Sequence, residues 1–366
     1  MKKMSVWTLF LIAGSLLLGL SAPYAATAQP SAFPPLPKGA VGETSDDVVR
    51  NVDSTRIRFP IICATNRKWT SSGYSALDRD TTSDEPAFVI RYAILDRSTH
   101  RLGQRNDVIF DSVKGTQADL HKLLGPAPDG NPKRYLVFVH GFTSNFEQSF
   151  QAASQMTFDI NRHYAPILFS WPSGTNMFTD YSAARDNTRD AGYKLAKTLE
   201  ILQARSGKAI EVDLVAHSLG SEVVMDGLKE LDTTPFEAIR TKILFRNIVF
   251  IAPDVSEQDF KRNVQWPVFG QSRTTLYTNA KDPVLAIPSA AVNYNERVGL
   301  KVQFSDLRVE NIDVTPLYPK VPSADGHTSI LNQPVGLMDL FMLLKHDQKA
   351  SYRNLYHTGK GWQIRK

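Results

Sequence analysis

The chain has 366 residues, of which 42% are hydrophobic and 22% are charged, and its net charge at pH 7 is +5. This balance excludes a disordered or collagen-like chain, and no internal repeat indicates a solenoid. No run of Lys and Arg is interleaved with aromatic residues, so we expect no nucleic-acid partner. The length allows one large α/β domain or two smaller ones.

The N-terminus has the features of a secretory signal peptide. Lys2 and Lys3 precede an apolar run from Val6 to Leu20, and small residues follow up to Ala28. This order predicts residues 1 to 28 as a signal peptide and export to the periplasm or the extracellular space. A retained membrane anchor is the alternative, but this run of 15 residues is shorter than the ~20 that a spanning helix needs. We therefore expect no stable membrane span after cleavage.

Residues 29 to 55 are expected to form a flexible lead-in, because they contain several prolines followed by a polar stretch. Cys63 is the single cysteine, so an exported protein with this sequence has no disulfide within the chain. Its stability must come from the hydrophobic core.

Residues 56 to 130 are expected to carry extra N-terminal strands ahead of the main core. Ile57 to Ala64, Ala87 to Leu95 and Val108 to Val113 are rich in β-branched and aromatic residues, which favours strands. The polar segment from Thr65 to Pro86 is expected to be a long loop. Thr116 to Leu124 is expected to be a short helix.

From residue 133 to residue 345 the pattern alternates between strands and helices, which predicts a mostly parallel central sheet with helices on both faces. The first strand, Tyr135 to Val139, is apolar throughout, as a central parallel strand should be. Later expected strands are Ile167 to Trp171, Ala209 to Val215, Ile243 to Ala252, Thr274 to Tyr277 and Ile312 to Val314, and the expected helices are Asn145 to Asn161, Tyr181 to Arg205, Leu219 to Leu231 and Pro334 to Leu344. Residues 346 to 366 are expected to be a C-terminal tail.

The stretch from Glu211 to Val224 predicts a buried strand, an abrupt turn and a helix, with Ser218 at the apex. So tight a turn needs small residues two positions before and after the apex, and these are Ala216 and Gly220. The turn would present the Ser218 hydroxyl at the carboxyl end of a strand, where open α/β sheets bind their ligands. We interpret Ser218 as a candidate nucleophile. A chance small-x-Ser-x-Gly sequence in an ordinary turn is the alternative.

A nucleophilic serine needs a base and a carboxylate that orients this base, and in this architecture they follow in the order Ser, acid, His. His327 is the candidate base because it lies in a loop after the last short strand, whereas His346 and His357 lie in or beyond the terminal helix. Asp282 is the preferred acid and Asp254, one strand earlier, is the alternative. Both precede or follow a proline, so both could instead be turn residues. If Asp282 is the acid, a change at Asp254 should have little effect.

Two backbone amides are candidates for the oxyanion hole. The amide of Leu219 follows the apex serine, and the amide of Phe142 lies in the loop after the first core strand. Gly141 lets this loop approach the substrate closely. An ordinary strand exit is the alternative interpretation. His140 is interpreted as a structural or site-lining residue and not as the base.

Four motifs of the sequence occur together, and they are Phe138-Val139-His140-Gly141-Phe142, Phe169-Ser170-Trp171-Pro172-Ser173, Ala216-His217-Ser218-Leu219-Gly220 and Ile251-Ala252-Pro253-Asp254. Together they resemble the α/β-hydrolase superfamily, and more narrowly a bacterial branch of largely uncharacterised, esterase- or lipase-like members. The resemblance covers roughly residues 57 to 345. It implies the α/β-hydrolase fold and serine-hydrolase chemistry without a cofactor, carried by Ser218, Asp282 and His327. Ala216 replaces the usual elbow glycine, and Ser329 stands where this branch often has an aromatic residue.

The sequence contains no His-Glu-x-x-His motif, cysteine pair, phosphate-binding loop or Gly-x-Gly-x-x-Gly motif, so we expect no metal and no cofactor. We therefore expect an exported serine esterase that acts on a small-molecule ester, of open oligomeric state. The alternative is a non-catalytic envelope or interaction protein on the same scaffold. Aromatic and apolar residues of two loops either cover the sheet as core or line an acyl pocket, and they are Phe260, Trp266, Val268 and Phe269 in one loop and Met177, Phe178 and Tyr181 in the other.

Overall fold

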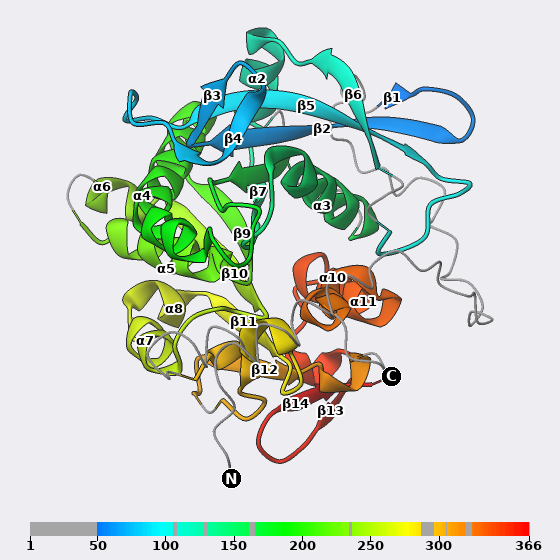
Figure 1. Cartoon of the computed structure of the whole chain (residues 1–366), viewed down its shortest axis with the longest axis vertical. Helices are drawn as coiled ribbons and strands as arrows, with labels where there is room; N and C mark the ends of the chain where they lie inside the picture. Colours follow the sequence, from blue (N-terminus) through cyan, green and yellow to red (C-terminus); the bar gives the residue numbers. More distant parts are fainter. Residues whose placement is uncertain are drawn as a thin grey trace.

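A computed structural model describes residues 50–104, 108–127, 130–160, 165–233, 236–286, 296–304, 306–318 and 324–365. These residues form a 12-stranded sheet with helices on both faces, and a separate two-stranded hairpin (Figure 1). The predicted signal peptide, residues 1 to 28, and most of the predicted lead-in lie outside the described residues. Across the ranges given above, no helix combines the length and apolar character that a membrane crossing requires.

The sheet has the strand order β13-β14-β12-β11-β10-β9-β7-β8-β2-β5-β6, and β1 pairs with β2. Neighbours are parallel from β12 through to β2, and β5 and β6 continue the sheet in antiparallel pairing. The strands are β1 (Arg50–Asn51), β2 (Arg56–Thr65), β5 (Ala87–Asp96), β6 (Val108–Lys114), β7 (Lys133–Val139), β8 (Ala165–Ser170), β9 (Ile210–His217), β10 (Ile243–Ile251), β11 (Arg273–Thr278), β12 (Val309–Asp313), β13 (Leu355–His357) and β14 (Trp362–Ile364). The predicted fold class, an α/β-hydrolase-type sheet preceded by extra N-terminal strands, is confirmed.

Two layers of helices cover the sheet. Side chains alternate along β7, so that Tyr135, Val137 and Val139 join one buried cluster while Leu136 and Phe138 join the other. Both faces of the strand are therefore buried, as its unbroken apolar sequence requires. The first cluster packs against α2 (Gln117–Leu124), α4 (Tyr181–Ser206), α5 (Gly220–Glu230), α7 (Glu257–Asn263) and α8 (Pro267–Gln271), and the second packs against α3 (Phe146–Asp159), α10 (Ser329–Asn332) and α11 (Pro334–Leu344), while α6 (Glu237–Arg240) follows α5.

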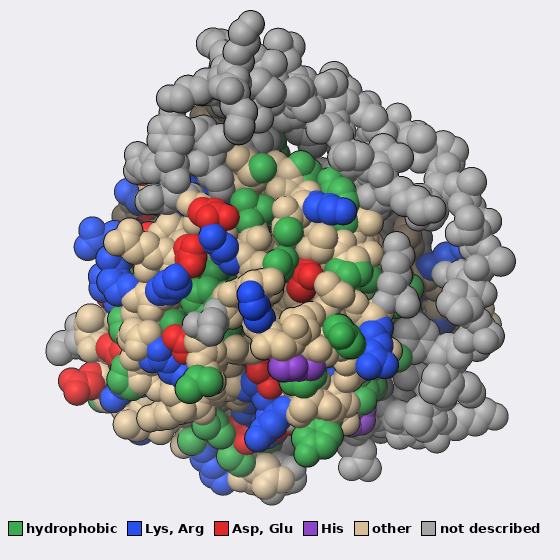
Figure 2. Space-filling view, turned by 90° about the horizontal axis from the view of Figure 1, so that it is seen from below, with side chains coloured by type: hydrophobic (Ala, Val, Ile, Leu, Met, Phe, Trp, Pro, Cys, Tyr) green, Lys and Arg blue, Asp and Glu red, His purple; other side chains and the backbone are tan. Residues whose placement is uncertain are grey.

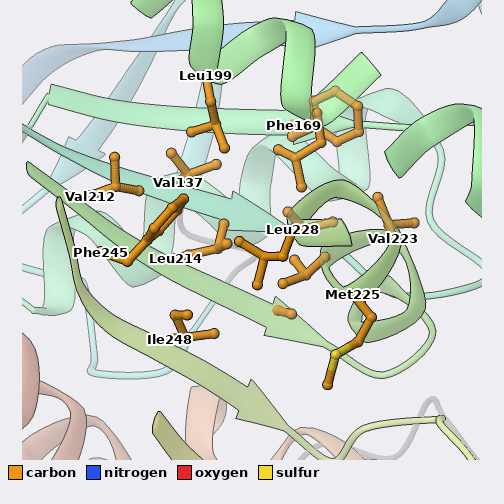
Figure 3. Close-up of a cluster of buried hydrophobic side chains, with 14 of the residues drawn as sticks. Val137, Phe169, Leu199, Val212, Leu214, Val223, Met225, Leu228, Phe245 and Ile248 are labelled. Carbon is orange, nitrogen blue, oxygen red and sulfur yellow. The ribbon is translucent and has the colours of Figure 1, made fainter. Parts of the chain in front are cut away.

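The first cluster fixes the position of the turn between β9 and α5. Val212 and Leu214 of β9 belong to the same buried cluster as Leu199 of α4 and Leu228 of α5 (Figure 3). Leu199 is fully buried, so truncation to Ala would cost about 2 to 5 kcal/mol of stability. This packing holds the end of β9 and the start of α5 in one rigid unit.

Helix starts follow local capping chemistry. Thr116 caps α2 in a capping box with Asp119, and Asn145 caps α3 in a capping box with Gln148. Each reciprocal pair satisfies backbone donors of the first turn that have no partner within the helix. The Asn145 cap also fixes where the loop after β7 ends.

The segment from Thr65 to Pro86 was expected to be a loop, and this prediction is wrong. It contains the hairpin of β3 (Arg67–Thr70) and β4 (Gly73–Arg79). Gly73, with a φ of 112°, makes the turn, and the rings of Trp69 and Tyr74 meet edge-on with centroids 4.8 Å apart. The strands of this hairpin are largely polar and only partly buried, so the sequence lacks the alternating apolar pattern that would have predicted them.

The C-terminal residues were expected to be a tail outside the domain, and this is also wrong. β14 pairs in parallel with β12, and β13 pairs with β14, so both belong to the main sheet. The buried side chain of Arg353 anchors them, because it donates to Asp339 of α11 and to Glu310 of β12. Three-residue strands are too short to give a periodic signal.

The surface seen from below in Figure 2 carries Lys and Arg side chains interspersed with Asp and Glu over its described part.

Candidate active site

Ser218 lies at the turn between β9 and α5, with a φ of 53°. Left-handed backbone is uncommon for a residue other than glycine and indicates a locally strained turn. The turn is fixed on both sides, because the Ser218 amide donates to the carbonyl of Ile251 at 2.9 Å and its own carbonyl accepts from Ser221 at 3.0 Å. This geometry is that of the predicted elbow.

The elbow and the loop after β7 approach each other so closely that both need glycine. A Cβ on Gly220 would lie 2.8 Å from the carbonyl oxygen of Val139 and closer still to that of His140. A Cβ on Gly141 would lie 2.8 Å from the Cβ of Ser218. Gly141 was expected to let the loop approach a substrate, and it lets the loop approach the elbow itself.

His327 and Asp282 are brought together, 45 residues apart in sequence, with 2.6 Å between His327 Nδ1 and Asp282 Oδ2. The second carboxylate oxygen of Asp282 accepts the backbone amides of Val284 at 2.9 Å and Leu285 at 3.2 Å. Both side chains are at least nine-tenths buried. The carboxylate is therefore fixed by the backbone on one side and orients the imidazole on the other.

His327 lies in the short helix η4 (Ala324–Thr328), directly against the elbow. Its ring lies 4.8 Å from that of His217, the last residue of β9, measured between centroids. The Nε2 atom of His217 lies 3.3 Å from the carbonyl oxygen of His327 and donates to it. Asn279 supports the same turn by donating to the carbonyl of Gly326 at 3.2 Å.

Leu219 follows Ser218 directly, and Phe142 follows Gly141, whose backbone approaches the Cβ of Ser218 closely. Within the part of the chain that the structure describes, neither amide donates to a protein acceptor. Leu219 starts α5, so its amide lies at the positive end of the helix dipole. Both amides therefore remain candidate donors to a negatively charged substrate oxygen.

Asp254, the alternative acid, has other partners. Its carboxylate accepts the Tyr181 hydroxyl at 2.9 Å and lies 2.9 Å from Nε of Arg297, an ion pair whose N–H is not directed along the hydrogen-bond line. Burial raises the pKa of the Asp254 carboxyl, and Arg297 offsets part of this effect. Of the two candidate acids, only Asp282 contacts His327 through its carboxylate.

The other histidines are placed as expected from the sequence. His346 and His357 are exposed, whereas His140 is buried. Burial and the neighbouring Arg67 hold the pKa of His140 well below its usual value, so this imidazole is neutral. Sequence reasoning missed Arg67, Glu222 and Arg297 as members of the site's surroundings, since no local motif marks a buried charged group.

The two aromatic loops differ in role. Phe260 and Phe269 are buried against Phe250 of β10 and are ordinary core. Phe178 is 53% exposed, and the ring of Tyr181 meets that of Phe142 edge-on at 5.3 Å. Trp266 is partly buried against the same core, so the second segment, next to Phe142, is the better candidate for lining a substrate pocket.

No group of three or more potential metal-ligating side chains occurs within the described ranges. Cys63 is buried in β2, and burial strongly raises the pKa of its thiol. A buried, protonated thiol is a poor nucleophile.

Two comparisons with known proteins give limited similarity. A comparison with curated proteins gives no match. A solved structure titled "Crystal structure of Aspergillus fumigatus lipase B" is similar at 15% identity, covering 65% of this chain and 59% of that chain, with a TM-score of 0.38. The present chain thus spans less than two thirds of that lipase chain, and a likeness of this size carries no argument about activity.

A family model matches the central part of the sequence. It covers residues 116–313, which run from the start of the capped helix α2 to the end of β12 and include Ser218, Asp254 and Asp282. The match takes in more than half of the chain. The protein belongs to the family described as alpha/beta hydrolase of unknown function (DUF900).

Proposed function

We propose that this protein is an exported serine hydrolase that cleaves carboxylic esters through an acyl-enzyme intermediate. In this proposal Ser218 is the nucleophile, His327 the base and Asp282 the residue that orients the base. The amides of Phe142 and Leu219 bind the oxyanion. One observation carries the proposal: a buried His–Asp pair, with 2.6 Å between Nδ1 and Oδ2, contacts His217, the residue directly before a serine held at a φ of 53°.

The proposed first step is acylation. His327 Nε2 takes the proton of the Ser218 hydroxyl as its oxygen attacks the ester carbonyl. The ester C=O electron pair moves onto oxygen, and the two backbone amides stabilise the resulting charge. When the tetrahedral intermediate collapses, the C–O bond to the alcohol breaks and the protonated His327 gives its proton to the leaving alkoxide.

The proposed second step is deacylation. Water attacks the acyl group on Ser218, His327 takes its proton, and collapse returns this proton to the Ser218 oxygen as the acid is released. Asp282 accepts the hydrogen bond from the protonated Nδ1 of His327 in both steps, which keeps Nε2 free to act as base. No cofactor is needed for this balance.

Export is part of the proposal and rests on the sequence of residues 1 to 28, with its charge, apolar core and small-residue cleavage site. The mature protein would begin at Gln29. Intact-mass measurement of the protein from an envelope or culture fraction tests this, and retention of residues 1 to 28 in a membrane-bound form would favour an anchor.

The experiment that tests the chemistry is labelling with a fluorophosphonate probe, together with hydrolysis of p-nitrophenyl acetate. Ser218→Ala should abolish labelling and lower kcat by roughly 10⁶, and His327→Ala should have a similar effect. The matched control is Ser221→Ala, because Ser221 is buried one turn further on and its hydroxyl has no partner among the described residues. Turnover by Ser218→Ala at the wild-type rate would contradict the proposal. A folded wild type that never reacts with the probe would favour the non-catalytic alternative.

A further inference from the structure

Arg67 is a buried arginine whose five N–H groups all have acceptors. It lies at the start of β3, and only 2% of the residue is exposed. Nε donates to the Ser170 hydroxyl at 2.9 Å, and Nη1 donates to the carbonyls of Ser75 and Ala76, both at 3.0 Å. These bonds fix the guanidinium to its own hairpin and to the end of β8, so its remaining nitrogen has a set direction.

The remaining nitrogen, Nη2, reaches both ends of the loop after β7. It donates to the Ser144 carbonyl at 2.6 Å and lies 3.3 Å from Nε2 of His140. Arginine has no acceptor, so His140 Nε2 must accept this hydrogen bond. The loop residues Gly141, Phe142 and Thr143 lie between these two attachment points.

The tautomer of His140 follows from the same contacts. Its Nε2 also accepts the backbone amide of Trp171 at 3.1 Å, so the proton is on Nδ1, which donates to the carbonyl of Gly141 at 2.8 Å. The carbonyl of His140 in turn accepts the indole N–H of Trp171 at 2.8 Å. Arg67 therefore acts on Gly141 through a neutral imidazole of fixed orientation.

The loop that these contacts hold is strained. Thr143 has a φ of 58°, which is a genuine outlier for a β-branched residue. On its C-terminal side, the Ser144 carbonyl accepts from Ser173 at 3.0 Å as well as from Arg67. Strain of this kind persists only where the surroundings fix the backbone from both sides.

We propose that Arg67 is a positioning residue that holds the loop from His140 to Ser144 in its strained conformation and so directs the Phe142 amide toward the substrate oxygen at Ser218. The link to catalysis rests on the proposed function. Residues of the described hairpin come before the family-matched region, 116–313, so a part of the chain outside that match would complete the site.

The first test compares Arg67→Met with the wild type. We expect kcat for p-nitrophenyl acetate to fall about 10- to 100-fold, with KM changed less than about twofold, because the loss of a well-aimed oxyanion donor acts on the transition state. Arg67→Lys should restore little, since a single ammonium cannot span both attachment points. The matched control is Arg58→Met, which removes an arginine of β2 that pairs with Asp111 away from this loop, and its kcat should stay within twofold of wild type.

The second test is rescue by Thr143→Gly. Glycine adopts a positive φ without the strain of threonine, so the loop no longer needs the Arg67 contacts to keep its conformation. In the Arg67→Met background this change should raise kcat at least about fivefold, whereas in the wild type it should change kcat less than about twofold. Relief of the Thr143 strain can also raise stability, so kcat is compared on fully folded samples, where an Arg67 that only stabilises the fold would leave kcat unchanged.

Amide hydrogen exchange provides a readout that does not need turnover. Peptides covering residues 140 to 146 should exchange at least about tenfold faster in Arg67→Met, whereas exchange in the core strand β9 should be unchanged. If Arg67→Met does not fold, Ser173→Ala provides a smaller perturbation of the same loop. An inactive wild type would refute the proposed function, but hydrogen exchange would still test whether Arg67 holds the loop from His140 to Ser144. Unchanged exchange of the loop in a folded Arg67→Met variant, or no rescue by Thr143→Gly, would overturn the inference.

Discussion

The carbonyl oxygen of Ser218 accepts the backbone amide of Asp254 at 3.1 Å. This bond holds the Asp254 backbone against the elbow. Its position in the sequence, directly after β10, had made Asp254 the alternative candidate for the acid. Its carboxylate, however, is directed to Tyr181 and Arg297, while Asp282 contacts His327. The two aspartates are therefore expected to fail in different ways when they are replaced.

Asp282→Asn should lower kcat about 10⁴-fold with little change in stability, because an amide next to Nδ1 stabilises the wrong imidazole tautomer. The amide oxygen of Asn can still accept from Val284 and Leu285, so the local turn should persist. Ester hydrolysis and thermal unfolding measured on the same sample check this. A variant with full turnover would exclude Asp282 as the orienting acid.

Asp254→Asn was expected from the sequence to have little effect, and the contacts of this residue change that expectation. Arg297 is 1% exposed, so the variant leaves a buried cation without its counter-charge, which costs about 3 to 5 kcal/mol. We expect the midpoint of urea unfolding to fall accordingly. The double variant Asp254→Asn, Arg297→Met should recover much of the loss, because neither charge then remains. If the single variant loses activity at unchanged stability, Asp254 has a direct role in the chemistry.

Glu222→Gln should change the pH dependence of stability. Burial raises the pKa of the Glu222 carboxyl to about 7 from an ordinary 4.5, and Arg185 offsets only part of this shift. Because the folded state favours the protonated form, the stability contributed by Glu222 is present below about pH 4.5 and is lost as the pH rises through 7. The permanently neutral variant should match wild type near pH 4.5 and exceed it by roughly 2 to 3 kcal/mol at pH 8.

Urea unfolding at the two pH values checks the Glu222 prediction, and Glu257→Gln provides a control of opposite sign. The Lys261 side chain lowers the pKa of the Glu257 carboxyl, so its contribution is present at high pH and is lost as the pH falls. A Glu222→Gln variant that is less stable than wild type at pH 8 would show that the Arg185 ion pair outweighs the burial of the charge.

Arg353→Met should destabilise the whole domain and not only its last strands. The Arg353 side chain has 0% exposure and donates to Asp339 at 2.8 Å and to Glu310 at 3.0 Å. The Asp339 oxygen that accepts from Arg353 also accepts from the Tyr277 hydroxyl at 2.6 Å. Its loss leaves a buried carboxylate unpaired, which costs about 3 to 5 kcal/mol. Asp339→Asn in the same background should reduce the cost. A small effect would mean that β13 and β14 fold independently of the core, and urea unfolding distinguishes the two outcomes.

Local chemistry decided which parts of this protein could be predicted from sequence. The elbow at Ser218 and helices such as α11 (Pro334–Leu344) were predicted with close boundaries, because small residues, apolar periods and proline act within a few positions. The pairing of His327 with Asp282 could be expected only from chain order. Contacts between distant segments, such as Arg67 with Ser144, have no local signature, and neither do strands of three residues such as β13 and β14.

The acyl preference is expected to be for short to medium chains. Phe260, Val268 and Phe269 are core residues of α7 and α8, and Trp266 packs against Phe269, so we expect this segment to add little apolar depth to a pocket. The candidates that remain are Met177, Phe178 and Tyr181. The Tyr181 ring meets Phe142, and its hydroxyl donates to Asp254, so this ring is fixed and limits the pocket next to the proposed oxyanion donor.

Each methylene that fits such a pocket should add about 0.8 kcal/mol, or roughly a fourfold gain in kcat/KM, until the pocket is full. We expect kcat/KM for p-nitrophenyl esters to rise from acetate, pass through a maximum at short to medium length and then fall. Phe178→Ala should lower the gain per methylene, since Phe178 is an exposed apolar side chain of this loop, whereas Tyr181→Phe keeps the ring and should preserve the maximum. A steady rise through palmitate, or activity only above the micelle threshold, would contradict a pocket of limited depth and indicate a lipase that acts on lipid surfaces.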